Sequence, residues 1–327
     1  MSKNPRFQTD PIKARRTVLF VLFPGFQLLD AAGPIAAFEI AGRVAPGAYG
    51  LRIAASEAGM VASSSGVCWP AQALKGQARI DTMIVVGGEG TREAMGDAGL
   101  ISVLRCAPGR MRRIASVCSG AFLLAQAGLL DGKRATTHWR RAPQLAKLFP
   151  KVVVEPDCIH IKDGLIWTSA GVTAGIDLAL ALIEEDLGAE AATEVAREMV
   201  VYAKRQGGQA QHSTLLELDA QSDRFAKLNA WMRCHLAEDL SVERLAREAA
   251  MSPRNFARAY AAETGATPAK AVERLRAEAA RAALQRRGPI QQIAAKTGFG
   301  DPERMRRAFM RLYGAPPAAL RRTLRHA

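Results

Sequence analysis

The chain has 327 residues, 49% of them hydrophobic, and a net charge of +14. This length and apolar content are enough for two packed domains and exclude general disorder. Five cysteines without a CxxC pair or regular spacing exclude a disulfide framework and a zinc site. We therefore expect a cytoplasmic protein with no metal or other cofactor.

The positive charge is concentrated in the C-terminal third. Residues 209–327 carry 21 Lys and Arg against 12 Asp and Glu, whereas residues 1–208 carry 24 against 19. No stretch approaches the ~20 apolar residues needed to cross a bilayer, and no segment pairs the charge with an aromatic insertion face. The charge predicts a nucleic-acid partner for this third, not a membrane.

The first part of the chain alternates apolar runs with helical patterns. The apolar runs are residues 17–23, 51–55, 82–88, 113–117 and 166–170. This alternation predicts a mostly parallel sheet covered by helices on both faces. The first run follows basic residues, as in a secretory signal, but it is only seven residues long before Pro24. We interpret it as a buried strand.

The stretch RIASVCSGAFLLAQAG, residues 113–128, places Cys118 between a strand pattern and a helix pattern. The small residues Ser116 and Gly120 have the spacing of a nucleophile elbow, and the helix N-terminus would favour a thiolate. The alternative is a buried cysteine that acts as a small hydrophobe. Because parallel sheets bind ligands at the carboxyl ends of their strands, Asp30, Gly88 and Cys118 are candidates for one pocket.

From residue 223 onward only helical spacing remains, and it contains an imperfect repeat. The two copies are LAREAAMSPRNFARAYAAETGATP, residues 245–268, and IAAKTGFGDPERMRRAFMRLYGAPP, residues 293–317. Each fits a helix-turn-helix motif, with Ser252 or Asp301 as the N-cap of an arginine-bearing second helix. The alternative, a helical bundle with solvated arginines, is disfavoured by the duplication and the local basicity.

The repeat also predicts how DNA is bound. Residues in the first turns of a recognition helix reach base edges. The predicted base contacts are Arg254, Asn255, Arg258, Glu303, Arg304 and Arg307. The predicted phosphate contacts are Arg274, Arg276, Arg321 and Arg322. The apolar positions Leu245, Ala246, Ala294 and Phe309 are predicted to be core.

Two resemblances follow from these motifs. Residues 223–327 resemble the DNA-binding domain of AraC/XylS regulators, in Ile293-Ala294, Gly298-Phe299, Phe309, Gly314, Pro317 and Arg321. Residues 17–205 resemble the ThiJ/PfpI superfamily, related to class I glutamine amidotransferases, in VVGGEG, SVCSGAFLLAQAGLLDG, ATTHW and TSAGVTAGIDLAL. The order of the two domains resembles GlxA-type regulators, with residues 1–16 as a tail and residues 206–222 as a polar linker.

The resemblance implies a flavodoxin-like α/β sandwich followed by an all-α domain with two helix-turn-helix motifs. It implies a homodimeric transcriptional activator that binds double-stranded DNA, RNA polymerase and a small-molecule effector, with nitrogen-containing metabolites as first candidates. The alternative is a cysteine-dependent hydratase or amidase with a DNA-binding appendage. Proteolysis is disfavoured, since Ser119 stands where ThiJ/PfpI proteases have histidine.

The resemblance also gathers five residues in one pocket: Asp30, Gly88, Cys118, Ser119 and His138. Asp30 would lie against the sulfur of Cys118, and the amides of Gly88 and Ser119 would hold an anion. His138 would act as a base or bind the ligand. The bland alternatives are that Asp30 caps a helix beginning near Ala31 and that His138 only lines the wall.

Overall fold

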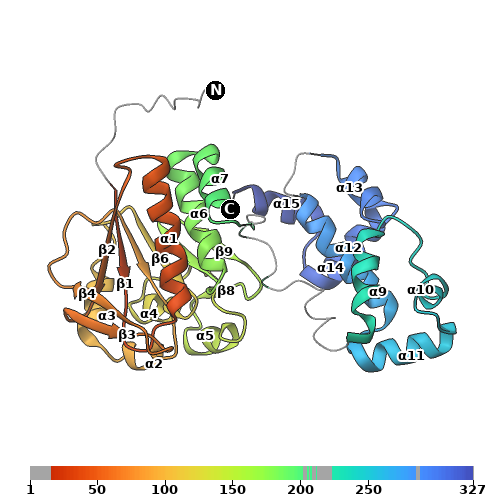
Figure 1. Ribbon diagram of the computed structural model, residues 1–327, viewed down its shortest axis with the longest axis horizontal. Helices are drawn as coiled ribbons and strands as arrows, with labels where there is room; N and C mark the ends of the chain where they lie inside the picture. Colours follow the sequence, from red (N-terminus) through yellow and green to blue (C-terminus); the bar gives the residue numbers. More distant parts are fainter. Residues whose placement is uncertain are drawn as a thin grey trace. The chain divides into compact units, whose positions relative to one another are not determined.

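The computed structural model describes residues 16–201, 205, 207, 211, 223–284 and 288–326. The chain divides into two compact units, residues 1–208 and 209–327, each with its own core (Figure 1). The predicted tail, apart from Arg16, and the predicted linker, apart from Gly207 and Gln211, lie outside the described residues.

The first unit is built on an eight-stranded sheet in the order β3-β4-β2-β1-β5-β6-β10-β9. Neighbours pair in parallel from β4 to β10, and only the two edge strands, β3 and β9, are antiparallel. A separate short pair joins β7 to β8. The strands are β1 (Arg16–Val21), β2 (Tyr49–Ala55), β3 (Gly59–Ala62), β4 (Cys68–Ala73), β5 (Thr82–Val85), β6 (Arg113–Val117), β7 (Arg134–Ala135), β8 (Val153–Val154), β9 (His160–Asp163) and β10 (Ile166–Ser169).

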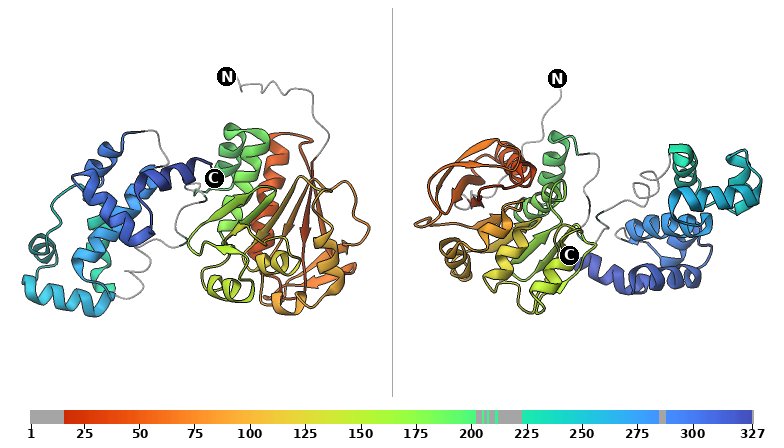
Figure 2. Two further views of the ribbon diagram at one scale, coloured as in Figure 1. Left: turned by 180° about the vertical axis from the view of Figure 1, so that it is seen from behind. Right: turned by 90° about the horizontal axis from the view of Figure 1, so that it is seen from below.

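Helices cover both faces of this sheet (Figures 1 and 2). One face carries α1 (Leu28–Val44), α6 (Ala174–Leu187) and α7 (Ala189–Glu198), and the other carries α2 (Thr91–Ala94), α3 (Ala98–Arg105) and α4 (Gly120–Gln126). The remaining helix, α5 (Ala142–Leu148), packs against β8. Because side chains alternate along a strand, Val18 and Phe20 enter the core beneath α1 and α6, whereas Leu19 and Val21 enter the core beneath α3 and α4. Burial on both sides explains the continuous apolar runs.

The predicted fold class is confirmed, and the five predicted strands correspond to β1, β2, β5, β6 and β10. Strands β3, β4, β7, β8 and β9 were not predicted from the sequence. In β4 no side chain is fully buried, and Pro70 interrupts it, so that strand lacks the apolar run that marks the central strands.

A buried arginine fastens α6 to the start of the central strands. Arg113 of β6 is only 2% exposed, and its guanidinium donates to Asp186 Oδ2 at 2.6 Å and to Glu185 Oε2 at 2.9 Å. Tyr49 of β2 donates its hydroxyl to the same Asp186 carboxylate at 3.0 Å. This network fixes α6 at the end of the sheet opposite Cys118.

The second unit consists of helices in its described part. They are α9 (Asp223–Cys234), α10 (Val242–Glu248), α11 (Pro253–Thr264), α12 (Pro268–Leu284), α13 (Ile290–Lys296), α14 (Pro302–Tyr313) and α15 (Pro317–His326). There are two cores: one contains Phe256 and Tyr260 of α11, and the other contains Met305 and Phe309 of α14. The long helix α12 contributes Leu275 to the first core and other residues to the second, so it joins the two motifs.

The helix ends follow the repeat. Gly265 and Gly314 end α11 and α14 in the left-handed conformation, at φ +69° and +67°, which only glycine adopts without strain. Asp301 caps α14 through its side chain, as predicted, whereas Ser252 occupies the N-cap of α11 without a side-chain hydrogen bond. No helix in the described ranges is long and apolar enough to span a membrane.

Candidate functional site

Cys118 lies in a tight turn between β6 and α4. Its φ is +55°, the left-handed conformation expected of a nucleophile elbow, and its N–H donates to Ser169 O at 3.0 Å. Glycines on both neighbouring strand ends make room: a Cβ on Gly171 would lie 2.2 Å, and one on Gly87 2.8 Å, from Cys118 Cβ. The neighbouring strands β5 and β10 therefore hold the turn closely on both sides.

Asp30 is the acidic partner of this turn. Its side chain is fully buried, and Oδ1 accepts a hydrogen bond from the Val172 N–H at 2.7 Å. The thiol of Cys118 faces the same carboxyl group. The alternative that Asp30 caps a helix is wrong, because α1 has Gln27 at its N-cap and Asp30 lies inside the first turn.

Burial decides the protonation of this pair. It raises the pKa of Asp30 to about 6, although hydrogen bonds from Val172, Cys118 and Gly87 favour the carboxylate. Burial, with the charge of Asp30, raises the pKa of the Cys118 thiol to about 12. The expectation of a thiolate at the helix N-terminus is therefore not met, because desolvation outweighs the favourable dipole.

Ser119 fills the position where an anion was expected. Its Oγ accepts the Gly88 N–H at 2.9 Å and lies 2.7 Å from Thr91 Oγ1. The Gly88 amide therefore already has a partner, and the predicted anion-binding role of Gly88 is not supported. The Ser119 N–H faces the sulfur of Cys118 and favours its charged form.

His138 follows Thr137, which contacts the turn at Cys118 directly. Thr137 Oγ1 donates to Cys118 O at 2.7 Å, a contact that the sequence analysis missed because threonine carries no distinctive signal. The ring of His138 is half-buried and stacks against Trp139, with Nδ1 3.4 Å from the Arg140 N–H. Neither of these two contacts is with Cys118.

A cavity of about 390 Å³ opens beside this turn, a volume suited to a small ligand. Gly88, Thr91 and Ser119 form one wall, and Phe122 of α4 adds an apolar surface. The other lining residues are Glu89, Arg92, Met95, Arg141, Gln144 and Leu148. The lining thus offers both cationic and anionic groups, and Arg141 lies only loosely, at 3.9 Å, from Glu89.

The raised pKa of Asp30 predicts a pH-dependent effect of Asp30→Asn. The unfolded carboxyl ionises near its usual pKa of 3.8 and the folded one near 6, so ionisation destabilises the native chain as pH rises between these values. Asparagine does not ionise, so the variant does not lose this stability. Between about pH 4 and pH 7 the unfolding free energy of the variant should gain up to about 3 kcal/mol on that of the native chain, in urea titrations.

Asp97→Asn is the matched control. Asp97 accepts hydrogen bonds from Leu100 N–H and Ser56, which hold its pKa below the usual range. The unfolding free energy of Asp97→Asn should therefore fall relative to that of the native chain as pH rises. A pH-independent difference for Asp30→Asn would contradict the raised pKa of the buried carboxyl.

The predicted base-contacting residues lie on two exposed helix faces. Arg254, Asn255 and Arg258 are exposed on α11, above the buried Phe256 and Tyr260. On α14, Glu303, Arg304 and Arg307 are likewise exposed, above the buried Met305 and Phe309. Leu245, Ala246, Ala294 and Phe309 are fully buried, so their prediction as core is confirmed.

Three of these side chains also have partners within the chain. Arg258 donates to Asn255 Oδ1 at 3.1 Å, which orients both groups on one face of α11. Glu303 pairs with Arg306 at 2.7 Å. Glu303 must leave this pair if it is to accept a hydrogen bond from a base.

The four predicted phosphate contacts differ in how well the structure supports them. Arg276 Nε donates to Leu236 O at 3.0 Å and a terminal nitrogen donates to Glu238 O at 2.8 Å, so this guanidinium supports the turn after α9. These bonds argue against the phosphate contact predicted for Arg276. Arg274 is exposed and Arg321 half-buried, whereas the side chain of Arg322 lies outside the described residues.

Comparison with known proteins assigns both units. Residues 16–185 match the DJ-1/PfpI family and residues 245–323 a helix-turn-helix domain. The chain is 31% identical to the HTH-type transcriptional regulator GlxA of Rhizobium meliloti, over 93% of this chain and 94% of that protein. It is 33% identical to the isonitrile hydratase of Pseudomonas putida, over 53% of this chain and 73% of that one.

A solved structure supports the fold of the first unit. A ThiJ/PfpI family protein from Pseudomonas syringae superposes with a TM-score of 0.55 at 26% identity, covering 63% of this chain and 83% of that chain. The GlxA match extends over both units, whereas the hydratase match covers about half of the chain. The chain therefore belongs to the DJ-1/PfpI family and, within it, to the GlxA-like transcriptional regulators that carry an AraC-type helix-turn-helix domain.

Proposed function

We propose that this protein is a cytoplasmic, sequence-specific activator of transcription that works as a homodimer. The observation that carries the proposal is the pair of recognition helices, α11 and α14, each packed on its own core and joined by α12. Each helix exposes arginines in its first turns, the part that reaches base edges in helix-turn-helix complexes.

Selection from a random pool of duplex DNA tests this proposal. Two helices that enter successive major grooves read elements about one helical turn, ~10 base pairs, apart. The full chain should enrich a motif with two such elements. Enrichment of a single element would leave one motif without a role in base recognition, and no enrichment would contradict sequence-specific binding.

We also propose that the effector occupies the cavity beside Cys118. Arg92 and Arg141 can meet a negative group and Glu89 a positive one, so the lining fits a small molecule that carries both a carboxylate and a nitrogen-centred cation. The lining includes Ser119, the neighbour of Cys118, whose thiol faces the buried Asp30. RNA polymerase is the partner that such an activator would recruit.

The chemistry at Cys118 favours binding over turnover. A cysteine nucleophile attacks as the thiolate, and an adjacent base normally forms it. Here burial keeps the thiol protonated, and its acidic neighbour Asp30 is itself buried. These features support a ligand pocket built on an elbow that enzymes of this family use.

A hydratase remains the second candidate, because the isonitrile hydratase is 33% identical over the matched region. Incubation with isonitriles, nitriles and amides, followed by product analysis, separates the two. We expect no turnover by the native chain. Turnover that disappears in Cys118→Ser and persists in Cys106→Ser would establish the enzyme instead.

A further inference from the structure

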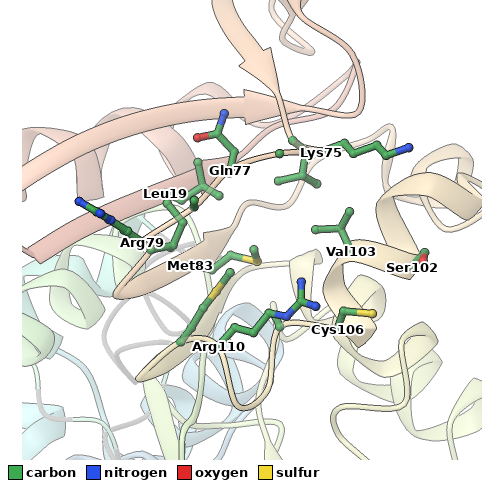
Figure 3. A pocket seen from close by; sticks show the side chains of 15 residues that line it. Leu19, Lys75, Gln77, Arg79, Met83, Ser102, Val103, Cys106 and Arg110 are labelled. Atoms are coloured by element: carbon green, nitrogen blue, oxygen red, sulfur yellow. The ribbon is translucent and has the colours of Figure 1, made fainter.

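A second cavity lies at the other end of the same sheet. It has a volume of about 440 Å³, and Figure 3 shows the side chains that line it. Its floor includes the buried Leu19 of β1 and Met83 of β5, near where the central strands begin. Cys118 follows the opposite end of the neighbouring strand β6, so this cavity is separate from the first one.

The walls come from three segments. The chain between β4 and β5 contributes residues 74–80, and α3 contributes Ser102 and Val103. The connection before β6 contributes Cys106, Ala107, Arg110 and Met111. Leu74, Ile80 and Ala107 are buried, so the inner part of the cavity is apolar. An apolar body of a ligand would therefore be stabilised there by desolvation.

The rim carries only positive charge. Lys75, Arg79 and Arg110 line the cavity, and its lining contains no aspartate or glutamate. Within the described ranges, none of these three cations forms an ion pair or a side-chain hydrogen bond. In Figure 3, Lys75 and Arg110 both extend toward α3 on either side of Val103, whereas Arg79 points away.

We propose that this cavity binds a small amphipathic anion, an organic carboxylate with an aliphatic body. The aliphatic body lies on Leu19 and Met83, and the carboxylate lies near Ser102 between the cations of Lys75 and Arg110. Such a ligand fits both the apolar inner part and the positively charged rim. A neutral or cationic ligand of equal size fits only the apolar part.

Isothermal titration of the full chain with octanoate, octanol and octylamine tests the site. Octanoate should bind at least ten-fold more tightly than the other two. Lys75→Met combined with Arg110→Met should remove this preference, and Arg105→Met, an exposed arginine of α3 outside the lining, should leave it intact. Cys118→Ser should also bind octanoate unchanged.

The proposal would be overturned by no octanoate binding, by equal binding of octylamine, or by binding that survives the double substitution. Loss of binding in Cys118→Ser would move the ligand to the first cavity and overturn it equally.

Different contacts carry a second inference, which rests on the proposed function. Asp30 holds the Val172 N–H, and Val172 has φ +51°, a strained conformation for a β-branched residue. The next residue, Thr173, accepts a hydrogen bond from a terminal nitrogen of Arg205 at 2.8 Å. Asp177, in the first turn of α6, accepts the Arg205 N–H at 2.7 Å and its Nε at 2.9 Å.

These bonds connect Asp30, which the thiol of Cys118 faces, to the end of the first unit. Two residues beyond Arg205, the carbonyl of Gly207 accepts the Ile159 N–H at 2.7 Å. A Cβ on Gly207 would lie 2.8 Å from the ring of His160, so only glycine fits this close to that ring. Residues 205 and 207 are thus attached to α6 and to the start of β9.

We infer that Asp30, Val172, Thr173 and Arg205 form a relay between the pocket and the connection to the DNA-binding unit. A ligand that takes the carboxyl of Asp30 away from Val172 lets that strained residue relax. The movement displaces Thr173 and weakens the hydrogen bonds that attach Arg205 to α6. Asp177 and Arg205 are positioning residues in this relay.

Amide hydrogen exchange in the full chain tests the relay without DNA. Asp30→Ala should speed exchange of the Arg205 amide at least five-fold, and Arg205→Met should reciprocally speed exchange of the Val172 amide. Asp97→Ala, a side-chain cap removed elsewhere in the unit, should leave both amides unchanged. The central-strand amide of Ile84 reports any global loss of stability.

An unchanged Arg205 amide in Asp30→Ala would overturn the relay. Equal acceleration at Arg205 and Ile84 would also overturn it, because the effect would then be global. Because the readout needs no DNA, failure of the relay is distinguishable from failure of DNA binding.

Discussion

Gly298→Ala should destabilise the second helix-turn-helix motif by about 2–5 kcal/mol. A Cβ on Gly298 would lie 1.7 Å from Leu236 O and 2.6 Å from Arg276 Nε, and the residue has φ +80°. The left-handed conformation costs about 1–2 kcal/mol for alanine, and a forced backbone shift about 1–3 kcal/mol more. The shift would also disturb the hydrogen bond between Arg276 and Leu236 O.

Gly300→Ala separates the two costs. Gly300 also has φ +80°, but no heavy atom lies within 4 Å of its added Cβ. We expect this control to lose only the conformational part, about 1–2 kcal/mol. Native-state hydrogen exchange of peptides from α13 and α14 measures both losses, and peptides from α1 serve as an internal reference. Equal losses in the two variants would show that the approach of Gly298 to Leu236 is not tight.

Arg254→Ala combined with Arg307→Ala should lose about 2–6 kcal/mol of affinity for a selected DNA site. A good contact to a base edge contributes about 1–3 kcal/mol of discrimination, and the two arginines lie on separate helices with separate cores. We therefore expect the two losses to add. Fluorescence anisotropy at one fixed salt concentration measures them.

Random duplex DNA and a phosphate variant provide the controls for this pair. Arg274→Ala should weaken binding equally on selected and random DNA, because phosphates carry no sequence information. Arg105→Ala removes one positive charge from the first unit and should change neither affinity by more than a factor of about two. If the pair of recognition-helix substitutions weakens random DNA as much as the selected site, Arg254 and Arg307 contact phosphates instead of bases.

The pattern of apolar residues was sufficient to predict the central sheet and the two motifs. The strand 113–117 was predicted to the residue, because a buried parallel strand is apolar on both faces. The repeated Gly265 and Gly314 marked the helix ends, since the left-handed conformation there requires glycine. Strand β4, which lies next to the edge strand β3, was missed because its side chains are exposed or half-buried.

Of the candidate site, the contact between Asp30 and Cys118 was predicted, but not its chemistry. Spacing and resemblance placed Asp30, Cys118 and Ser119 together, but the sequence could not show that burial keeps the thiol protonated. Nor could it show that Ser119 takes the Gly88 amide or that Arg276 bonds to Leu236. Such partners depend on tertiary packing between segments far apart in the chain, which local sequence patterns do not encode.

The most direct test of the central claim is a map of where the full-length protein binds DNA in its own host cell, made with the native chain and with the Arg254→Ala, Arg307→Ala variant. The account predicts discrete sites that share one two-part motif for the native chain, and loss of those sites in the variant at equal protein level. The absence of discrete sites for the native chain, or their full retention by the variant, would contradict it.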